Sequence, residues 1–252
     1  MLITSTKNEI VKSVRRLRDR SARRESGQHL IEGERLVFDA LEAGIVLETL
    51  FIEQGRTDFE ARVSALGAEF FSVSRAVLET VCDTSAPQGI AAAVRTPDLT
   101  APESAEDFPH GLIAALDALQ DPGNLGTIIR TADAIGTGST DAFSPKALRA
   151  AMGSTYHLRI FQCELSETLP KLRESGFSLV CGHLAGEERL PMLNRDCVIV
   201  IGNEANGVSD GIARLCSLCR LPMFGRAESL NASAAASILI FETAKKINGI
   251  EF

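Results

Sequence analysis

The chain has 252 residues, of which 45% are hydrophobic and 23% charged, and its formal net charge is −7. This length is enough for one or two domains with a sizeable core. No apolar run reaches the ~20 residues of a membrane-spanning helix, which excludes a bilayer-spanning segment of that kind.

The charge is unevenly distributed along the chain. Residues 1–24 hold eight Lys or Arg and two acidic residues, so they carry +6 and leave −13 on the remainder. Such asymmetry indicates a basic helix that contacts phosphate. A solvated helix face explains the same charges equally well.

Six cysteines are scattered along the chain, and Cys216 and Cys219 form the one close pair. Without a second pair or a nearby His, this spacing favours reduced thiols over a metal site. The first residues show no apolar signal-peptide core, so we expect a cytoplasmic protein with no membrane or metal partner.

The first part of the chain alternates between predicted strands and helices, which indicates a small α/β domain over residues 1–98. We expect helices at 7–24, 33–44, 58–66 and 75–81, and strands at 28–32, 47–52, 69–73 and 89–95. Three prolines and four acids in residues 96–110 indicate a linker, which we place at 99–110.

The second domain, residues 111–252, repeats this alternation. We expect strands at 111–119, 156–163, 177–184, 197–201 and 218–223, and helices at 124–135, 145–153, 167–175 and 232–247. Asn124 is the predicted N-cap of the first of these helices. The run Cys197–Ile201 is β-branched and unbroken, as in a central parallel strand.

Polar, glycine- or asparagine-bearing loops follow these strands. Ligands of open α/β sheets bind beyond the carboxyl ends of the strands, so we place the active site there. There is no Walker P-loop, and the single G-x-G, at Gly136 and Gly138, follows a helix instead of a strand. The four His lack metal-ligand spacing, and His183 is more simply a half-buried loop residue.

Three stretches carry a family resemblance: DPGNLGTIIRTADAIG (121–136), IGNEANGVS (201–209) and LPMFGRAESLNASAAA (221–236). They resemble, in order, the three motifs of the SpoU (TrmH-type) RNA 2′-O-ribose methyltransferases of the SPOUT superfamily. The resemblance implies a SPOUT-type α/β fold with a parallel sheet, in which the C-terminal part of the chain forms a trefoil knot. It also implies S-adenosylmethionine as the cofactor and methyl transfer to a ribose 2′-hydroxyl.

Site residues follow from matching these motifs position by position. The resemblance places the cofactor at Leu184, Ala185, Gly186, Ile201, Gly202, Leu221, Met223, Leu230, Asn231 and Ala232. It gives catalytic positions to Arg130, Asn124, Glu204, Ser229 and Asn231. Because arginine effectively never loses its proton, we expect Arg130 to bind the phosphate next to the reacting hydroxyl.

The first domain resembles the family's α/β/α substrate-binding module through Gln28–Val37 and Gln88–Val94. Such a module is more usual in rRNA-modifying members, so 23S rRNA is the expected substrate. The resemblance also implies sites that are completed across two subunits, so a homodimer is the expected assembly. Phosphate contacts are expected from Lys12, Arg15, Arg16 and Arg18. The alternatives are a tRNA 2′-O-methyltransferase, a non-catalytic RNA-binding protein on the same fold and, less strongly, a dinucleotide-binding oxidoreductase.

One departure from the family pattern follows Gly138. The segment Asp141–Lys146 comes almost directly after it, so that roughly ten residues of a strand and loop are missing. Either the sheet has lost a strand or the printed sequence closes over a missing segment. A true loss favours the non-catalytic alternative.

Overall fold

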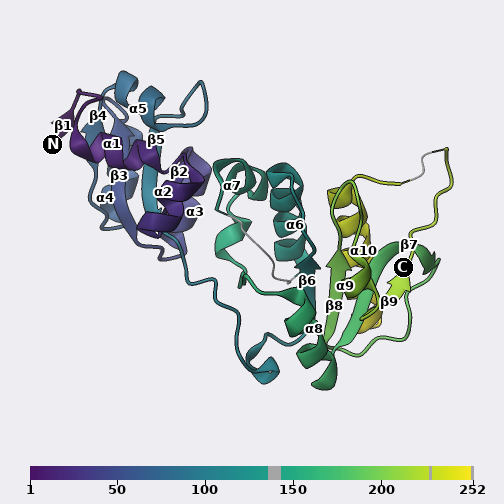
Figure 1. Ribbon diagram of the computed structural model, residues 1–252. Helices are drawn as coiled ribbons and strands as arrows, with labels where there is room; N and C mark the ends of the chain where they lie inside the picture. The colour runs from purple at the N-terminus through teal and green to yellow at the C-terminus, as the bar shows by residue number, and fades with distance from the viewer. Residues whose placement is uncertain (136–142, 227–228, 251–252) are drawn as a thin grey trace. The chain divides into compact units, whose positions relative to one another are not determined.

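The computed structural model describes residues 1–135, 143–226 and 229–250 (Figure 1). The chain forms two compact units. The first contains Met1–Asp98 and Phe143–Tyr156, and the second contains Leu99–Ala142 and His157–Phe252. The first unit therefore includes a segment that lies well inside the expected second domain.

The first unit is built on a mixed sheet with the strand order β1-β4-β3-β5-β2. Its strands are β1 (Leu2–Ile3), β2 (Gln28–Glu32), β3 (Leu47–Glu53), β4 (Phe71–Val73) and β5 (Ile90–Arg95). β5 lies antiparallel between β2 and β3, and its residues Ile90–Val94 are fully buried. This apolar run explains its central place in the sheet.

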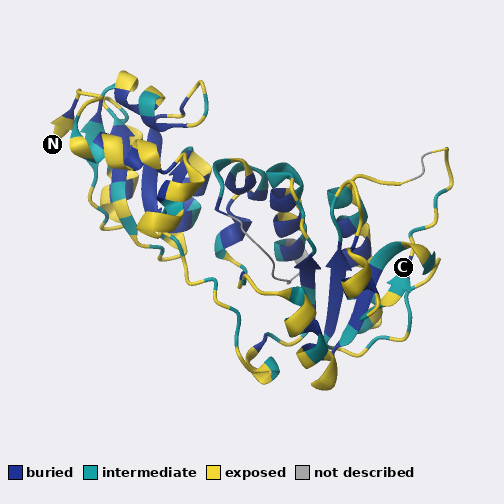
Figure 2. Ribbon diagram, in the orientation of Figure 1, coloured by how far each residue is buried: buried dark blue, intermediate teal, exposed yellow. Residues whose placement is uncertain are grey.

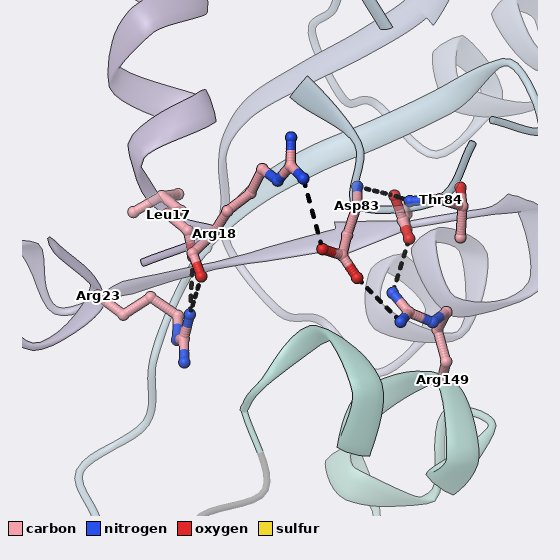
Figure 3. Close-up of polar contacts among 7 residues, drawn as sticks. Leu17, Arg18, Arg23, Asp83, Thr84 and Arg149 are labelled. Carbon is pink, nitrogen blue, oxygen red and sulfur yellow. Dashed lines mark hydrogen bonds and ion pairs between the residues drawn. The ribbon is translucent and has the colours of Figure 1, made fainter. Parts of the chain in front are cut away.

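The described helices of the first unit are α1 (Glu9–Arg16), α2 (Arg20–Ser26), α3 (Glu34–Glu42), α4 (Thr57–Ala65), α5 (Arg75–Val81) and α7 (Pro145–Ala151). The single helix expected at 7–24 is wrong, because the chain breaks into α1 and α2. At this break, Arg23 Nη1 donates to the carbonyls of Leu17 (3.0 Å) and Arg18 (2.8 Å) (Figure 3). These bonds satisfy carbonyls that follow the end of α1.

The second unit contains a parallel sheet with the strand order β6-β8-β7-β9. Its strands are β6 (Leu112–Leu116), β7 (Ser178–Glu187), β8 (Cys197–Ile201) and β9 (Ser217–Cys219). β8 is buried at every position and is dark blue throughout in Figure 2. The carboxyl ends of parallel strands meet at one edge, which prepares a binding site there.

The described helices of the second unit are α6 (Pro122–Ile135), α8 (Leu165–Glu174), α9 (Asp210–Ala213) and α10 (Ala232–Asn248), with a 3₁₀ turn η1 at Ala105–Asp107. α6 begins before Asn124, and Asn124 N donates to Asp121 Oδ1 at 2.9 Å. The expected N-cap at Asn124 is therefore wrong: Asp121 caps the helix and Pro122 takes its first position.

The strand expected at 156–163 is also wrong. Residues Ser154–Tyr156 form a 3₁₀ turn, η2, and the bridge between Thr100 and Gln162 is the β-pairing found in this stretch of the described chain. Phe161 packs edge-on against Phe108, with ring centroids 5.5 Å apart. Packing against the 99–110 segment has replaced the expected strand pairing.

Residues 99–110 pack on the second unit instead of forming a free linker. Phe108 is 7% exposed and joins the core beside α8 and β7. Residues 136–142, where the departure after Gly138 falls, lie outside the described residues. In the described part of the chain, no helix is long and apolar enough to cross a bilayer.

Candidate active site

A cavity of about 590 Å³ lies at the carboxyl ends of β7, β8 and β9. Its walls come from the end of β7, the loop after β8, the segment after β9 and the first turns of α10. These are three of the polar loops that the sequence placed together. The expected position of the site, beyond the strand ends, matches the position of this cavity.

Seven of the ten expected cofactor positions line this cavity. Leu184 contributes from β7, and Ile201 and Gly202 contribute from the end of β8 and the loop after it. Leu221, Met223, Leu230 and Ala232 contribute from the segment after β9 and from α10. The expected strand at 218–223 ends at Cys219, so Leu221 and Met223 lie in irregular chain along the wall.

Ala185, Gly186 and Asn231 do not line the cavity, although Leu184, next to Ala185, and Leu230 and Ala232, on either side of Asn231, do. A Cβ on Gly186 would collide with the backbone of Leu218 and Cys219. Asn231 caps α10, where its Oδ1 accepts from Ser233 N at 2.9 Å and from Ala234 N at 3.4 Å. The Asn231 amide oxygen is therefore committed to the helix, which leaves its N–H groups for a ligand.

Gly202 is required by the loop itself. A Cβ at this position would collide with backbone atoms of Gly207 and Val208. The loop closes tightly because Asn203 and Gly207 exchange two backbone hydrogen bonds, each 2.9 Å long. The resemblance placed Gly202 at the cofactor, and the structure adds a steric reason for glycine within the protein itself.

Glu204 joins the first motif to the second. Its carboxylate accepts from Asn124 Nδ2 (2.9 Å), Gln120 N (3.1 Å) and Asp121 N (3.0 Å). Desolvation raises the pKa of Glu204, but the bonds from Asn124 and from these backbone groups outweigh it and lower the pKa overall. The carboxylate is thus ionised, and it holds the loop before α6 against the loop after β8.

Arg130 lies on the exposed side of α6 and does not line the cavity. Within the described ranges it has no side-chain hydrogen bond or ion pair. Ser229 does line the cavity. Thr131, next to Arg130, bonds Ser237 of α10 at 2.9 Å, so α6 is fixed against the helix that borders the site.

Two residues that sequence reasoning did not select also line the cavity. Asn203 donates from Nδ2 to the carbonyl of Ala118 at 2.9 Å, which ties the loop after β8 to the loop after β6. His183 lines the cavity at the end of β7, and its Nδ1 accepts from Ala185 N at 3.2 Å. Asn203 could have been found from its place inside the second motif, and His183 from its place at a strand end.

The thiols of Cys216 and Cys219 are both free. Burial raises the pKa of Cys216 to about 11 and also raises that of Cys219, so both are protonated and unreactive. Among the residues with described positions, no three His, Cys, Asp or Glu side chains gather as a metal site would require.

Comparisons with known proteins assign the family. A family model described as the SpoU rRNA Methylase family matches residues 111–241, and one described as the MRM3-like substrate binding domain matches residues 8–92. The chain belongs to the SpoU rRNA methylase family. The resemblance drawn from the three motifs is therefore confirmed.

Relatives extend over nearly the whole SpoU chain. The 23S rRNA (guanosine(2553)-2′-O)-methyltransferase RlmP of Bacillus subtilis is 34% identical and covers 95% of this chain and 97% of its own. The crystal structure of an AdoMet-bound rRNA methyltransferase from Sinorhizobium meliloti has a TM-score of 0.84 at 32% identity and covers 97% of both chains. The AdoMet complex of AviRb from Streptomyces viridochromogenes has a TM-score of 0.83 at 25% identity and covers 97% of this chain and 100% of that one.

The four basic residues expected to bind RNA lie in the region matched by the substrate-binding model, and all four are exposed. Three have acidic partners: Lys12 pairs with Glu9 (2.7 Å), Arg16 with Glu25 (3.3 Å) and Arg18 with Asp83 (3.7 Å). Within the part of this SpoU chain that has described positions, Arg15 has no such partner. Arg15 is therefore the member of the set with a fully available charge.

Proposed function

We propose that this SpoU family chain transfers the methyl group of S-adenosylmethionine to a ribose 2′-hydroxyl of RNA, and that its substrate is 23S rRNA. The observation that carries the proposal is that the second and third motifs line one cavity and that a hydrogen bond ties the first motif to the second. Glu204 lines the cavity and bonds Asn124 of the first motif, and Ser229 of the third motif lines the same space. The rRNA methyltransferases among its relatives support the choice of substrate.

The cavity fits the cofactor in size and chemistry. Its volume of about 590 Å³ is within the usual range of small-molecule sites. Ile201, Leu221 and Leu230 offer apolar walls for a purine, and the loop 202–207 offers backbone polar groups. Bound there, S-adenosylmethionine supplies an electrophilic methyl group on a sulfonium.

The protein's own contribution to the reaction is to position the reactants. Ser229, together with the free N–H groups of Asn231, orients the ribose hydroxyl, while Glu204 and Asn124 fix the loop before α6. Arg130 binds the phosphate that adjoins this hydroxyl and so sets the line of attack. The guanidinium stays protonated throughout, so Arg130 acts by binding and not as a base.

We further propose that the working enzyme is a homodimer. Arg130 does not line the cavity of its own chain and is exposed on α6. On α10, Ile238 is 43% exposed and Phe241 45%, which leaves an apolar strip for a second copy. In this arrangement, Arg130 of the partner subunit completes each site.

The remaining expectations are proposals as well. One of them is a trefoil knot in the C-terminal part of the chain. The small residues at the start of α10 allow the close packing that a knot requires. We also propose that residues 1–98 bind RNA, that residues 111–252 carry the methyltransferase, and that the protein works in the cytoplasm.

The test is methyl transfer from radiolabelled S-adenosylmethionine to 23S rRNA, with tRNA from the same source as the comparison. We expect label in 23S rRNA at a ribose that then resists alkaline cleavage. Label in tRNA alone would show that tRNA, and not 23S rRNA, is the substrate. RNA binding with no label in any RNA would establish the non-catalytic alternative.

A further inference from the structure

The segment 143–156 is an integral part of the first unit, although it follows the first methyltransferase motif in the sequence. Phe143 is 3% exposed, and its ring centroid lies 4.7 Å from that of His29 on β2. α7 buries Ala147, Leu148 and Ala151. The segment is thus packed into this unit along its whole length.

An ion-pair network also fastens this segment. Arg149 of α7 donates to Glu32 at 2.9 Å and to Asp83 at 3.0 Å, and Asp83 also pairs with Arg18 (Figure 3). The Glu32 side chain is 6% exposed and further accepts from Asp83 N at 2.9 Å. A carboxylate this well buried and bonded holds its partners in one geometry.

The last residue of the segment has its own buried anchor. The Tyr156 hydroxyl bonds His29 Nε2 at 3.0 Å, and Thr96 Oγ1 bonds the other ring nitrogen at 3.0 Å. His29 is fully buried, so its neutral ring offers one donor and one acceptor to these two hydroxyls. Tyr156 N also donates to the carbonyl of Gly153 at 3.0 Å, so both the backbone and the side chain of Tyr156 are held.

The next residue is anchored in the other unit. His157 Nδ1 bonds Asp133 Oδ2 at 3.0 Å, and Asp133 lies on α6, three positions after Arg130. Residues three apart are neighbours on a helix surface. Tyr156 and His157 are consecutive residues, so a single peptide bond joins the two anchors.

We propose that the Tyr156–His157 junction couples the RNA-binding unit to α6, so that RNA held by the first unit sets the position of Arg130. Tyr156, His157 and Asp133 are then positioning residues for methyl transfer. This inference rests on the proposed function, because it assigns a route by which the substrate-binding unit acts on the catalytic arginine.

The direct test is a Gly-Ser-Gly-Ser insertion between Tyr156 and His157, which keeps both anchors and lengthens only the connection. We expect kcat to fall ~10-fold or more, because small misplacements of reacting groups cost this much. The dissociation constants for RNA and S-adenosylmethionine, measured separately, should change less than about twofold. The same insertion between the exposed residues Pro97 and Asp98, next to another crossing between the units, should leave kcat unchanged.

A point variant provides a second test with little risk to folding, because the His157 side chain is 54% exposed. His157→Ala should lower kcat in the native chain and have no further effect in the chain with the insertion. His110→Ala is the matched control, since His110 also bonds a carboxylate, Asp196, at 3.0 Å. The control should keep the native kcat, and hydrogen exchange of α6 should be the same in both variants.

The outcomes separate the two proposals. A native chain that methylates RNA, with an unchanged kcat after the insertion at 156/157, overturns the coupling and leaves the proposed function standing. Equal losses from the two insertions also overturn it. A native chain that methylates no RNA overturns the proposed function itself.

Discussion

Glu204 accepts a hydrogen bond from Asn124 Nδ2 at 2.9 Å across 80 positions of sequence. The bond joins the loop after β8 to the start of α6, so it holds together two motifs that are distant in the chain. The same carboxylate also receives the backbone N–H groups of Gln120 and Asp121. Its removal should therefore loosen a whole loop.

Replacement of this carboxylate provides the first prediction. Glu204→Ala should weaken S-adenosylmethionine binding ~10-fold, because three donors lose their acceptor beside the cavity. Calorimetric titration measures this change. Asn124→Ala should cost less alone and little more in the double variant, since both changes remove the same bond. Glu174→Ala, which removes an exposed carboxylate of α8, is the control and should bind normally.

Arg130→Ala provides the second prediction. We expect turnover to fall ~100-fold or more, because the reacting ribose loses its phosphate contact, while the dissociation constant for S-adenosylmethionine stays the same. Single-turnover methylation and equilibrium binding measure the two quantities. Near-native turnover of this variant would show that Arg130 has no role in catalysis.

The same variant tests the dimer. If each site combines Arg130 of the partner subunit with Asn231 of its own chain, Arg130→Ala and Asn231→Ala homodimers are both inactive. Mixing the two variants should then restore up to about a quarter of native activity, because exchange at equal amounts gives half heterodimers, each with one intact site. Mixtures that stay inactive under conditions of proven subunit exchange contradict the shared site.

Gly202→Ala provides the third prediction, about stability. The new methyl group would collide with the backbone of Gly207 and Val208, so unfolding free energy should fall by ~1–3 kcal/mol and cofactor binding should weaken. Gly211→Ala in α9 is the matched control, because a Cβ there meets nothing within 4 Å. This control should be neutral or slightly stabilising. Urea unfolding of both variants measures the two changes in unfolding free energy.

The pH dependence of stability provides the fourth prediction. Desolvation by burial, with a smaller contribution from Arg23, lowers the pKa of His29 to about 3 from its ordinary 6.5. As pH falls below 6.5, the unfolded chain binds a proton that the folded chain cannot accept, so stability is present above this pH and is lost towards pH 3. The loss between pH 7 and pH 5 should be ~2 kcal/mol. Urea unfolding of His29→Gln should show a flatter pH dependence, and that of His110→Ala should match the native chain.

RNA binding by α1 provides the fifth prediction. Arg15→Ala should weaken RNA binding more than Arg16→Ala, because Arg16 already pairs with Glu25 at 3.3 Å. Each lost phosphate contact lowers the slope of log affinity against log salt by ~1. A salt titration of the three-residue variant at Arg15, Arg16 and Arg18 measures the sum. An unchanged slope would show that RNA does not bind at these three arginines. Lys171→Ala on α8 serves as the control.

Much of this architecture could be predicted from sequence, because a buried strand is an unbroken apolar run that can be recognised in the sequence. The run Cys197–Ile201 predicted the central strand correctly, and the polar loops at strand ends indicated where the cavity lies. The helix break at Leu17–Asp19 could not be foreseen, since it depends on Arg23 reaching back to two carbonyls. The commitment of Asn231 to its helix likewise depends on geometry that the motif does not encode.

The place of residues 143–156 was the least predictable feature. Sequence order assigns them to the second domain, but Glu32 and His29 of β2 provide partners that order alone cannot reveal. A tertiary contact of this kind overrides proximity along the chain.

This discontinuity has a consequence for biosynthesis. The ribosome synthesises residues 1–98 before it reaches Arg149 and Tyr156. During this interval, Glu32 and His29 of the nascent first unit lack these partners. Domains usually fold in the order in which they emerge. Here the amino-terminal unit gains its last segment only after β6 and α6 of the second unit have also been synthesised, so it cannot be completed before synthesis of the second unit is under way.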